Sequence, residues 1–180
     1  SSDTLSDRDA NAIAHTLGTA TLTVNGSATL SGTVNLQGRA SPGDTTGTVT
    51  LTDTSGVLPP TVATIAANGS WSASVPVSPG GTTYQLDAAH SLYLGNRHAG
   101  IALLTGDTLP VPPTTLKGGD ANNDGTITVG DLSCIGGDFG GVPGTCGGAG
   151  SSDINADGTV NILDLVLPGG NYGLSTPQPW

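Results

Sequence analysis

Two short stretches of the sequence carry six of its fourteen carboxylates in the same arrangement. They read DANNDGTITVGD over residues 120–131 and DINADGTVNILD over residues 153–164. In each stretch, aspartate occupies positions one, five and twelve, asparagine position three, glycine position six and threonine position seven. Oxygen-bearing side chains at every second position of a turning chain can surround one hard cation, so this pattern indicates a metal loop.

The spacing is that of an EF-hand calcium loop, in which six to eight oxygens lie about 2.3–2.6 Å from the ion. Glycine at position six permits a sharp turn, position seven offers its backbone carbonyl, and position nine coordinates directly or through water. Three carboxylates against one divalent cation leave about one excess negative charge, a balance that favours calcium. We therefore predict two calcium ions. The predicted ligands are Asp120, Asn122, Asp124, Thr126, Thr128 and Asp131 for one ion, and Asp153, Asn155, Asp157, Thr159, Asn161 and Asp164 for the other.

Each loop continues into an aspartate-leucine pair and a short apolar segment, and both copies end in the motif GG[DN][FY]G. Paired loops of this kind resemble a dockerin module, whose two repeats each join a calcium loop to one helix. The resemblance covers residues 117–173, and aspartate at position twelve is typical of that family. It implies a cohesin partner that contacts loop positions ten and eleven, which are Val129 and Gly130 in the first copy, and Ile162 and Leu163 in the second.

The helices that follow the loops should be short, because each contains a glycine pair at a cost of about 1 kcal/mol per glycine. Pro168 is expected to end the second helix almost at once. At position eight, Ile127 and Val160 are expected to face inward and to pair the two loops through a short β contact.

Four apolar residues lie at the ends of the loops or just beyond: Val129, Ile162, Leu163 and Val166. They could pack against the rest of the chain, against a second copy, or against another partner. The sequence leaves these three alternatives open.

Upstream of the loops, residues 30–116 form a succession of short runs rich in Val and Thr, separated by glycine and proline. Alternation in SWSASVPV places Trp71 and three smaller apolar residues on one face, and residues 68–69 and 78–81 predict hairpin turns. The pattern predicts a mainly β protein built on a Greek-key β-sandwich. The runs SGTVNLQG, ANGSWSASVPV and TTYQLDAAHSLYLG resemble the carboxypeptidase regulatory-like, transthyretin-like sandwich, whose members are usually non-catalytic accessory modules.

We expect four parts along the chain. Residues 1–28 form an N-terminal extension with one strand, 29–116 the β-sandwich, 117–173 the dockerin-like module, and 174–180 a proline-rich tail. The strand TATLTVNG in the first part could complete the sheet of a neighbouring copy, and Trp180 could anchor in a neighbour's apolar groove.

Charge is scarce and mostly negative, since four Lys and Arg residues against fourteen aspartates give a net charge of −10. The scattered cations exclude a basic surface for nucleic acid or anionic lipid, and no apolar run approaches the roughly 18 residues of a membrane span. Cys134 and Cys146 are the sole cysteines and are predicted to form a disulfide. A disulfide indicates an oxidising, extracellular location.

Sequence motifs of catalysis are lacking: no GxSxG elbow, HExxH helix, phosphate loop or dinucleotide fingerprint occurs. We therefore predict a secreted, non-catalytic calcium-binding protein that mediates extracellular assembly or anchoring. One alternative is a self-associating subunit of a filament or layer. Another is a carbohydrate-binding accessory fragment of a larger secreted enzyme, for which the aromatic content of 3% offers few stacking platforms.

Overall fold

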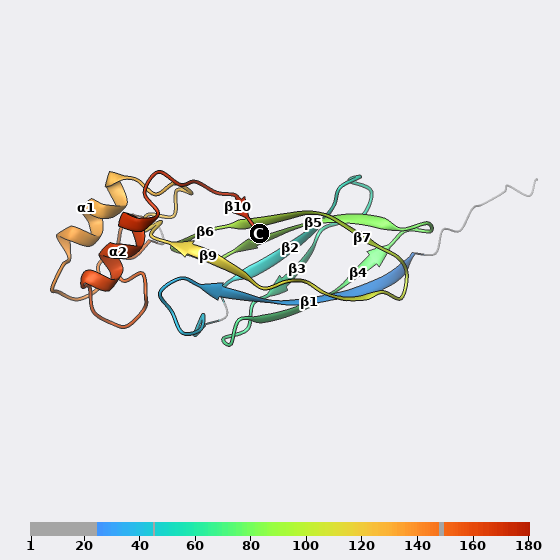
Figure 1. The fold of residues 1–180 in the computed structure, drawn as a ribbon, viewed down its shortest axis with the longest axis horizontal. Coiled ribbons are helices and arrows are strands. Elements are labelled where there is room, and N and C mark those ends of the chain that lie inside the picture. The colour runs from blue at the N-terminus through green and yellow to red at the C-terminus, as the bar shows by residue number, and fades with distance from the viewer. Residues whose placement is uncertain (1–24, 45, 148–149) are drawn as a thin grey trace, which may run out of the picture.

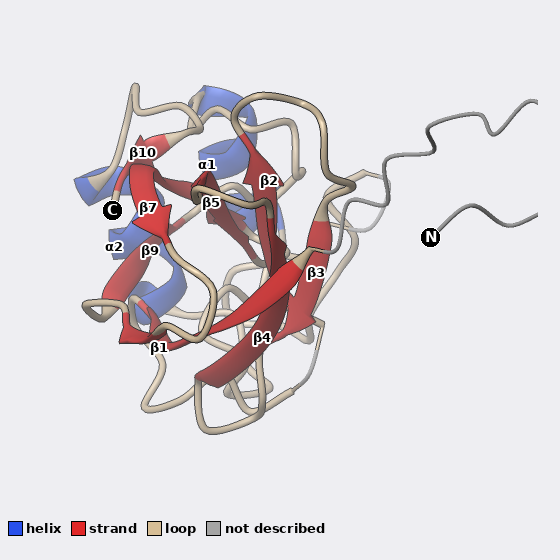
Figure 2. Cartoon of the chain, turned by 90° about the vertical axis from the view of Figure 1, so that its right-hand side faces the viewer, coloured by secondary structure: helices blue, strands red, loops and turns tan. Residues whose placement is uncertain are grey.

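The structure is a computed structural model that describes residues 25–44, 46–147 and 150–180. Two five-stranded β-sheets form a sandwich, and two short helices lie together at one end of it (Figure 1). Figure 2 looks along the sandwich from the end opposite the helices. The predicted mainly β fold with a β-sandwich is confirmed.

The first sheet consists of β1 (Gly26–Leu36), β4 (Ser70–Val77), β6 (Tyr93–Leu94), β8 (Thr108–Pro110) and β9 (Thr114–Gly118). Its order is β4-β1-β9-β6, with β8 also paired to β1. β1 runs antiparallel to β4 but parallel to β8 and β9. Because β1 begins at Gly26, the sandwich starts slightly before the predicted boundary at residue 29.

The second sheet consists of β2 (Thr48–Asp53), β3 (Thr61–Thr64), β5 (Thr82–Ala89), β7 (Asn96–Leu103) and β10 (Gln178–Pro179), in the order β10-β7-β5-β2-β3. The β2, β3, β5 and β7 pairs are antiparallel, and β10 is parallel to β7. Both sheets are therefore mixed, with parallel pairs beside the antiparallel pairs that a Greek key uses.

The core between the sheets follows the alternation of the strands. In β4, Trp71, Ala73, Val75 and Val77 are buried while the intervening residues are more exposed, as the sequence predicts. The same buried cluster continues beyond the sandwich into the loop-and-helix region, where it includes Ile154. The two parts of the chain thus share one core.

The two predicted hairpin turns form, but the strands that they join diverge into different sheets. At residues 66–70, the amide of Ala66 donates to the carbonyl of Ser70, and Gly69 has the positive φ of 86° that its turn requires. Beyond this turn, β3 pairs with β2 whereas β4 pairs with β1. The prediction of hairpins was wrong, because β3 and β4 each pair with another strand and not with each other.

Two helices follow the aspartate loops, α1 (Val129–Gly137) and α2 (Ile162–Gly170), each nine residues long. Neither is long and apolar enough to cross a membrane, and the described residues contain no other helix. The helices are short, as predicted, but Pro168 lies inside α2 instead of ending it. Pro168 is buried and lies against Gly119, so the helix loses one internal hydrogen bond at a place where it packs on the sandwich.

The C-terminal segment returns to the sandwich of its own chain. Trp180 donates from Nε1 to the Pro112 carbonyl at 2.8 Å and lies edge-on to the ring of His98. The prediction that Trp180 anchors in a neighbouring copy was therefore wrong. The predicted strand TATLTVNG falls almost entirely outside the described residues, and so does the homotypic assembly predicted for residues 1–28.

Candidate calcium-binding region

The first aspartate loop wraps around the carboxylate of Asp120. Its two oxygens accept the amides of Asp124 at 3.0 Å and Gly125 at 2.9 Å. The Asn122 side-chain oxygen also accepts the Asp124 amide, and an Asp124 oxygen accepts the Thr126 amide, each at 2.9 Å. These bonds hold the predicted ligands of positions one, three and five around one small loop.

The second loop repeats this network residue for residue. Asp153 accepts the amides of Asp157 at 3.2 Å and Gly158 at 3.0 Å. Asn155 and Asp157 in turn accept the amides of Asp157 and Thr159, both at 2.9 Å. The repetition in sequence is therefore a repetition in geometry.

Position four of each loop adopts a left-handed conformation that the sequence pattern does not predict. Asn123 has a φ of 57° and Ala156 a φ of 58°, beside the expected positive φ of the glycine at position six. Asparagine tolerates this region, whereas alanine is strained in it. The side-chain oxygen of Asn123 also accepts the Leu92 amide at 2.6 Å, which docks the first loop on the sandwich.

The aspartates at position twelve have two structural roles. Asp131 is fully buried and accepts the amides of Asn122 at 3.2 Å and Thr128 at 2.8 Å. Asp164, also fully buried, accepts those of Ile154 at 2.8 Å and Asn161 at 3.0 Å. Each therefore closes its loop and completes the capping box of the helix that follows.

The side chains at position nine act as helix N-caps. Thr128 accepts the Gly130 amide at 3.1 Å, and Asn161 accepts the Leu163 amide at 2.8 Å. The sequence pattern assigns these two residues to the metal but gives no weight to their capping role. Each of these side-chain oxygens also accepts the N3 amide of its helix, so the cap uses both of its lone pairs. A water-mediated contact to a metal therefore fits this arrangement better than a direct one.

The buried carboxylates of this region have no cationic partner among the described residues. Salt bridges there join Arg39 and His90 to Asp44, and Arg97 to Asp87. By contrast, the three most buried loop aspartates, Asp120, Asp131 and Asp164, are exposed by 3% or less and have only N–H and O–H donors. Hydrogen bonds alone therefore offset the burial of these three carboxylates, and their negative charge has no counter-charge among the described residues.

The pKa of Asp120 reflects this crowding. Burial raises it above its ordinary value, the amide bonds from Gly125 and Asp124 lower it, and the charges of Asp131 and Asp124 raise it again. In the second loop, Asp157 is exposed, and hydrogen bonds led by the Thr159 hydroxyl lower its pKa.

The donor chemistry suits a hard cation, since every predicted ligand atom is an oxygen. The described residues contain no group of three or more His, Cys, Asp or Glu side chains placed to hold a metal ion. The three aspartates of each loop therefore do not converge on one point in this structure. The fit to calcium rests on donor type and charge, since each loop offers three carboxylates together with asparagine, threonine and backbone oxygens.

Ile127 and Val160 are buried, as expected, but they do not pair the two loops. The amide and carbonyl of Ile127 bond to residues 173–174, which follow α2, and those of Val160 bond to residues 140–141, which follow α1. The expected contact between the loops was wrong. The repeated GG[DN][FY]G motif marks these two partner segments, because its final glycine has a φ of 80° at Gly140 and 79° at Gly173.

The four apolar residues at the ends of the loops are exposed on the two helices. Val129, Ile162, Leu163 and Val166 have exposed fractions of 63%, 56%, 56% and 53%. Packing against the chain's own sandwich is therefore excluded for this set. We call these four residues the helix face.

A disulfide joins Cys134 in α1 to Cys146 in the glycine-rich connector, as predicted, with an Sγ–Sγ distance of 2.05 Å. We expect replacement of both cysteines by serine to lower the free energy of unfolding by about 3 kcal/mol, because the bond closes a loop of the unfolded chain. Urea denaturation of the two proteins in the same calcium concentration measures the difference. Equal midpoints and slopes would show that the connector is ordered without the bond.

The contact between His90 and Asp44 was not foreseen and invites comparison with a catalytic relay. Both the Asp44 carboxylate, at 3.1 Å, and the Thr46 hydroxyl, at 3.4 Å, face the same ring atom, Nε2, while Nδ1 faces the Ser91 carbonyl. A hydroxyl–imidazole–carboxylate relay needs the hydroxyl and the carboxylate on opposite nitrogens. This trio is therefore a structural contact.

No protein-family model matches the sequence, and no curated protein matches it. Among solved structures, the fold is similar to one chain of a C-terminal interface mutant of the type II Cohesin-X-Dockerin complex from Acetivibrio cellulolyticus. That match has a TM-score of 0.60 and 18% identity, and covers 83% of this chain and 97% of the other. An N-terminal interface mutant of the complex gives a TM-score of 0.59, 20% identity and the same coverage.

These matches show the fold. The sandwich is like one found in cohesin–dockerin complexes, while its resemblance to carboxypeptidase regulatory-like domains stays a prediction. Because residues 1–118 are less than 83% of the 180-residue chain, the similarity extends into the loop-and-helix region.

Proposed function

We propose that this chain is an extracellular, non-catalytic assembly module that binds two calcium ions in a dockerin-like pair of loops. The observation that carries the proposal is the burial of Asp120, Asp131 and Asp164 without a cationic partner in the described part of the chain. Calcium would supply the missing positive charge and a common target for the loop oxygens. The Cys134–Cys146 disulfide supports an oxidising, extracellular location.

Each ion would be held by the six residues that the sequence pattern assigns to its loop. Positions one, three and five already lie together through the amide bonds of the turn. Position twelve would approach from the start of the helix, where its carboxylate is fixed by the capping box. Amide bonds use only part of the lone pairs of each carboxylate, so the remaining ones stay available to an ion.

Isothermal titration with calcium tests this proposal directly. We expect two ions per chain, and one ion in each of the single variants Asp124→Ala and Asp157→Ala, because position five supplies a charged ligand in each loop. Asp87→Ala is the matched control, since it removes the same charge from an exposed ion pair of the sandwich and should leave two sites. A wild-type protein that binds no calcium contradicts the proposal.

The partner that we propose for the helix face is a protein. Four large apolar side chains exposed on the two helices are costly in water unless a partner covers them. A cohesin-like domain is the first candidate, since the fold occurs in cohesin–dockerin complexes. A second copy of the chain is the alternative, because exposed apolar side chains can also be covered by the same surface of another copy.

Sedimentation velocity distinguishes the two partners. In calcium, the protein is run alone at increasing concentration and with a type II cohesin, using wild type, Leu163→Asp and the control Leu104→Asp, whose leucine is 60% exposed on the sandwich. We expect Leu163→Asp to abolish complex formation with the cohesin and Leu104→Asp to leave it unchanged. Self-association lost in that variant would identify a second copy as the partner, and no complex in either experiment would contradict the docking role. Carbohydrate binding stays a prediction, with retention on a polysaccharide as its test.

A further inference from the structure

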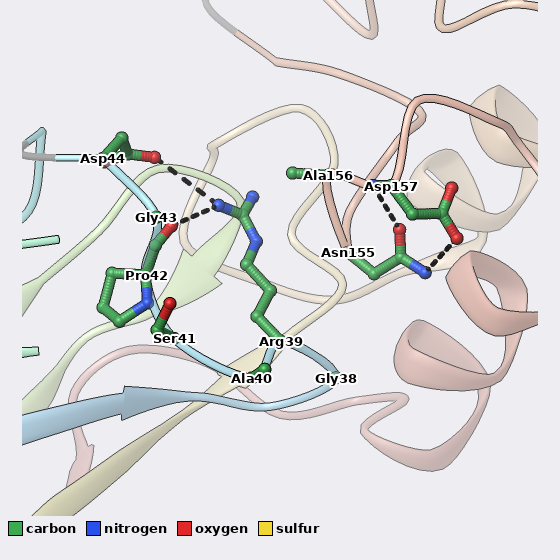
Figure 3. Close-up of a pocket in the computed structure, with 10 residues that line it drawn as sticks. All are labelled: Gly38, Arg39, Ala40, Ser41, Pro42, Gly43, Asp44, Asn155, Ala156 and Asp157. Carbon is green, nitrogen blue, oxygen red and sulfur yellow. Dashed lines mark hydrogen bonds and ion pairs between the residues drawn. The ribbon is translucent and has the colours of Figure 1, made fainter. Parts of the chain in front are cut away.

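The second calcium loop is held by a cationic residue of the sandwich. Arg39 lies in the loop after β1, and its Nε and Nη2 atoms donate to the Ile154 carbonyl at 3.1 Å and 3.0 Å. The hydroxyl of Tyr93 lies 3.0 Å from the same oxygen and 3.1 Å from the Gln37 carbonyl, and its single hydrogen is shared between these two acceptors. A cavity of about 520 Å³ is lined by residues 38–44 and by Asn155, Ala156 and Asp157. Figure 3 shows Arg39 between these two groups of residues, with its guanidinium toward Pro42 and Asp44.

The guanidinium is itself firmly placed. Its side chain is 8% exposed, its Nη1 donates to the Pro42 carbonyl at 3.2 Å, and Asp44 lies 3.5 Å from the same nitrogen. Its carbon atom Cζ lies 5.3 Å from the centre of the Tyr93 ring. A long side chain held at this many points loses little additional freedom when it holds a loop.

Ile154 stands at position two of the loop, between the predicted ligands Asp153 and Asn155. Its side chain is fully buried, its amide donates to Asp164 at 2.8 Å, and its carbonyl faces two Arg39 donors and the Tyr93 hydroxyl. One peptide segment therefore sets the separation of positions one and three and the direction of position twelve.

The first loop has no equivalent of this contact. Its position two is Ala121, whose carbonyl accepts only the backbone amide of Ser151, at 3.0 Å, among the described residues. The two loops, which are otherwise alike, are thus attached to the sandwich by different chemistry. This difference gives each loop a matched control within the same chain.

Resting on the proposed calcium function, we propose that Arg39, assisted by Tyr93, is the positioning residue of the second calcium loop alone. In the absence of calcium, opening of the second loop would break the contact between Arg39 and the Ile154 carbonyl. The contact therefore favours the closed conformation, in which the predicted ligands are directed toward the ion. Calcium affinity of the second loop therefore depends on the sandwich, and that of the first loop does not depend on Arg39.

Single-site proteins provide the test. Asp124→Ala leaves the second site and Asp157→Ala leaves the first, and calcium affinity is measured by titration in each background with Arg39→Met, Arg39→Lys or Tyr93→Phe added. We expect Arg39→Met and Arg39→Lys to weaken the second site about tenfold or more, and Tyr93→Phe about threefold to tenfold. The first site should change less than about twofold.

Arg39→Lys separates position from charge, because lysine keeps the charge but not the planar pair of donors. If charge dominated, Arg39→Met would strengthen the second site and Arg39→Lys would leave it unchanged, and either result overturns the inference. Equal weakening of both sites also overturns it, since that indicates general destabilisation, which the thermal midpoint of each variant checks. Tyr93→Phe keeps the buried ring, so it serves if Arg39→Met does not fold. Absence of calcium binding in Asp124→Ala and Asp157→Ala before Arg39 is changed is a failure of the proposed function itself.

Discussion

Removal of calcium by a chelator is expected to destabilise the sandwich together with the loops and helices. At free calcium one hundred times the dissociation constant, each site adds about 2.7 kcal/mol to the free energy of unfolding, so two independent sites add about 5 kcal/mol. The sequence suggests that only residues 117–173 would unfold. The structure instead joins both parts through one buried cluster and through the bonds of Arg39 and Tyr93 to the Ile154 carbonyl.

Two spectroscopic signals report on the two parts. Helix ellipticity reports on α1 and α2, the only helices among the described residues, and fluorescence of the buried Trp71 reports on the sandwich in a Trp180→Phe background. We expect the two melting curves to coincide with and without chelator, and to shift together to lower temperature when calcium is removed. Loss of the helix signal while Trp71 stays buried would contradict the shared core.

Local patterns of the sequence predicted the parts of the structure that depend on neighbouring residues. The loop network repeats at positions one, three and five because a turning chain can only present its own nearby amides to those side chains. Burial of Trp71 on one face of β4 follows equally from alternation within one strand. The calcium that these loops are expected to hold was inferred from the same local pattern and stays a prediction.

Contacts between distant segments could not be predicted from the sequence, because the fold determines which residues meet. Arg39 is one of four scattered cations, and nothing near it in the sequence points to Ile154, which lies 115 residues away. The pairing of Ile127 with residues 173–174 is of the same kind, although the repeated GG[DN][FY]G motif did mark it. Pro168 shows the converse, since a local rule for ending helices gave way to burial of its ring.

Replacement of Gly119 by alanine is expected to have the second large effect, because this residue lies where the sandwich meets α2. Gly119 has a φ of 122°, and a Cβ atom there would lie 2.6 Å from Cα and 2.7 Å from N of Pro168. Both atoms belong to the backbone of α2, so no side chain can move aside. Relief would require α2 to shift from the sandwich, which would strain the bond from Asn171 Nδ2 to the Gly118 carbonyl, now 2.8 Å long.

We expect Gly119→Ala to lower the free energy of unfolding by about 3 kcal/mol or more, since it combines backbone strain with overpacking. Gly169→Ala is the matched control in α2, where no atom lies within 4 Å of the added methyl group, and it should stabilise the protein by up to about 1 kcal/mol. Urea denaturation in saturating calcium measures both variants against wild type. Because both substitutions add the same methyl group, opposite signs would locate the effect at the contact between Gly119 and Pro168, whereas a stable Gly119→Ala protein would mean that α2 can move away from the sandwich at little cost.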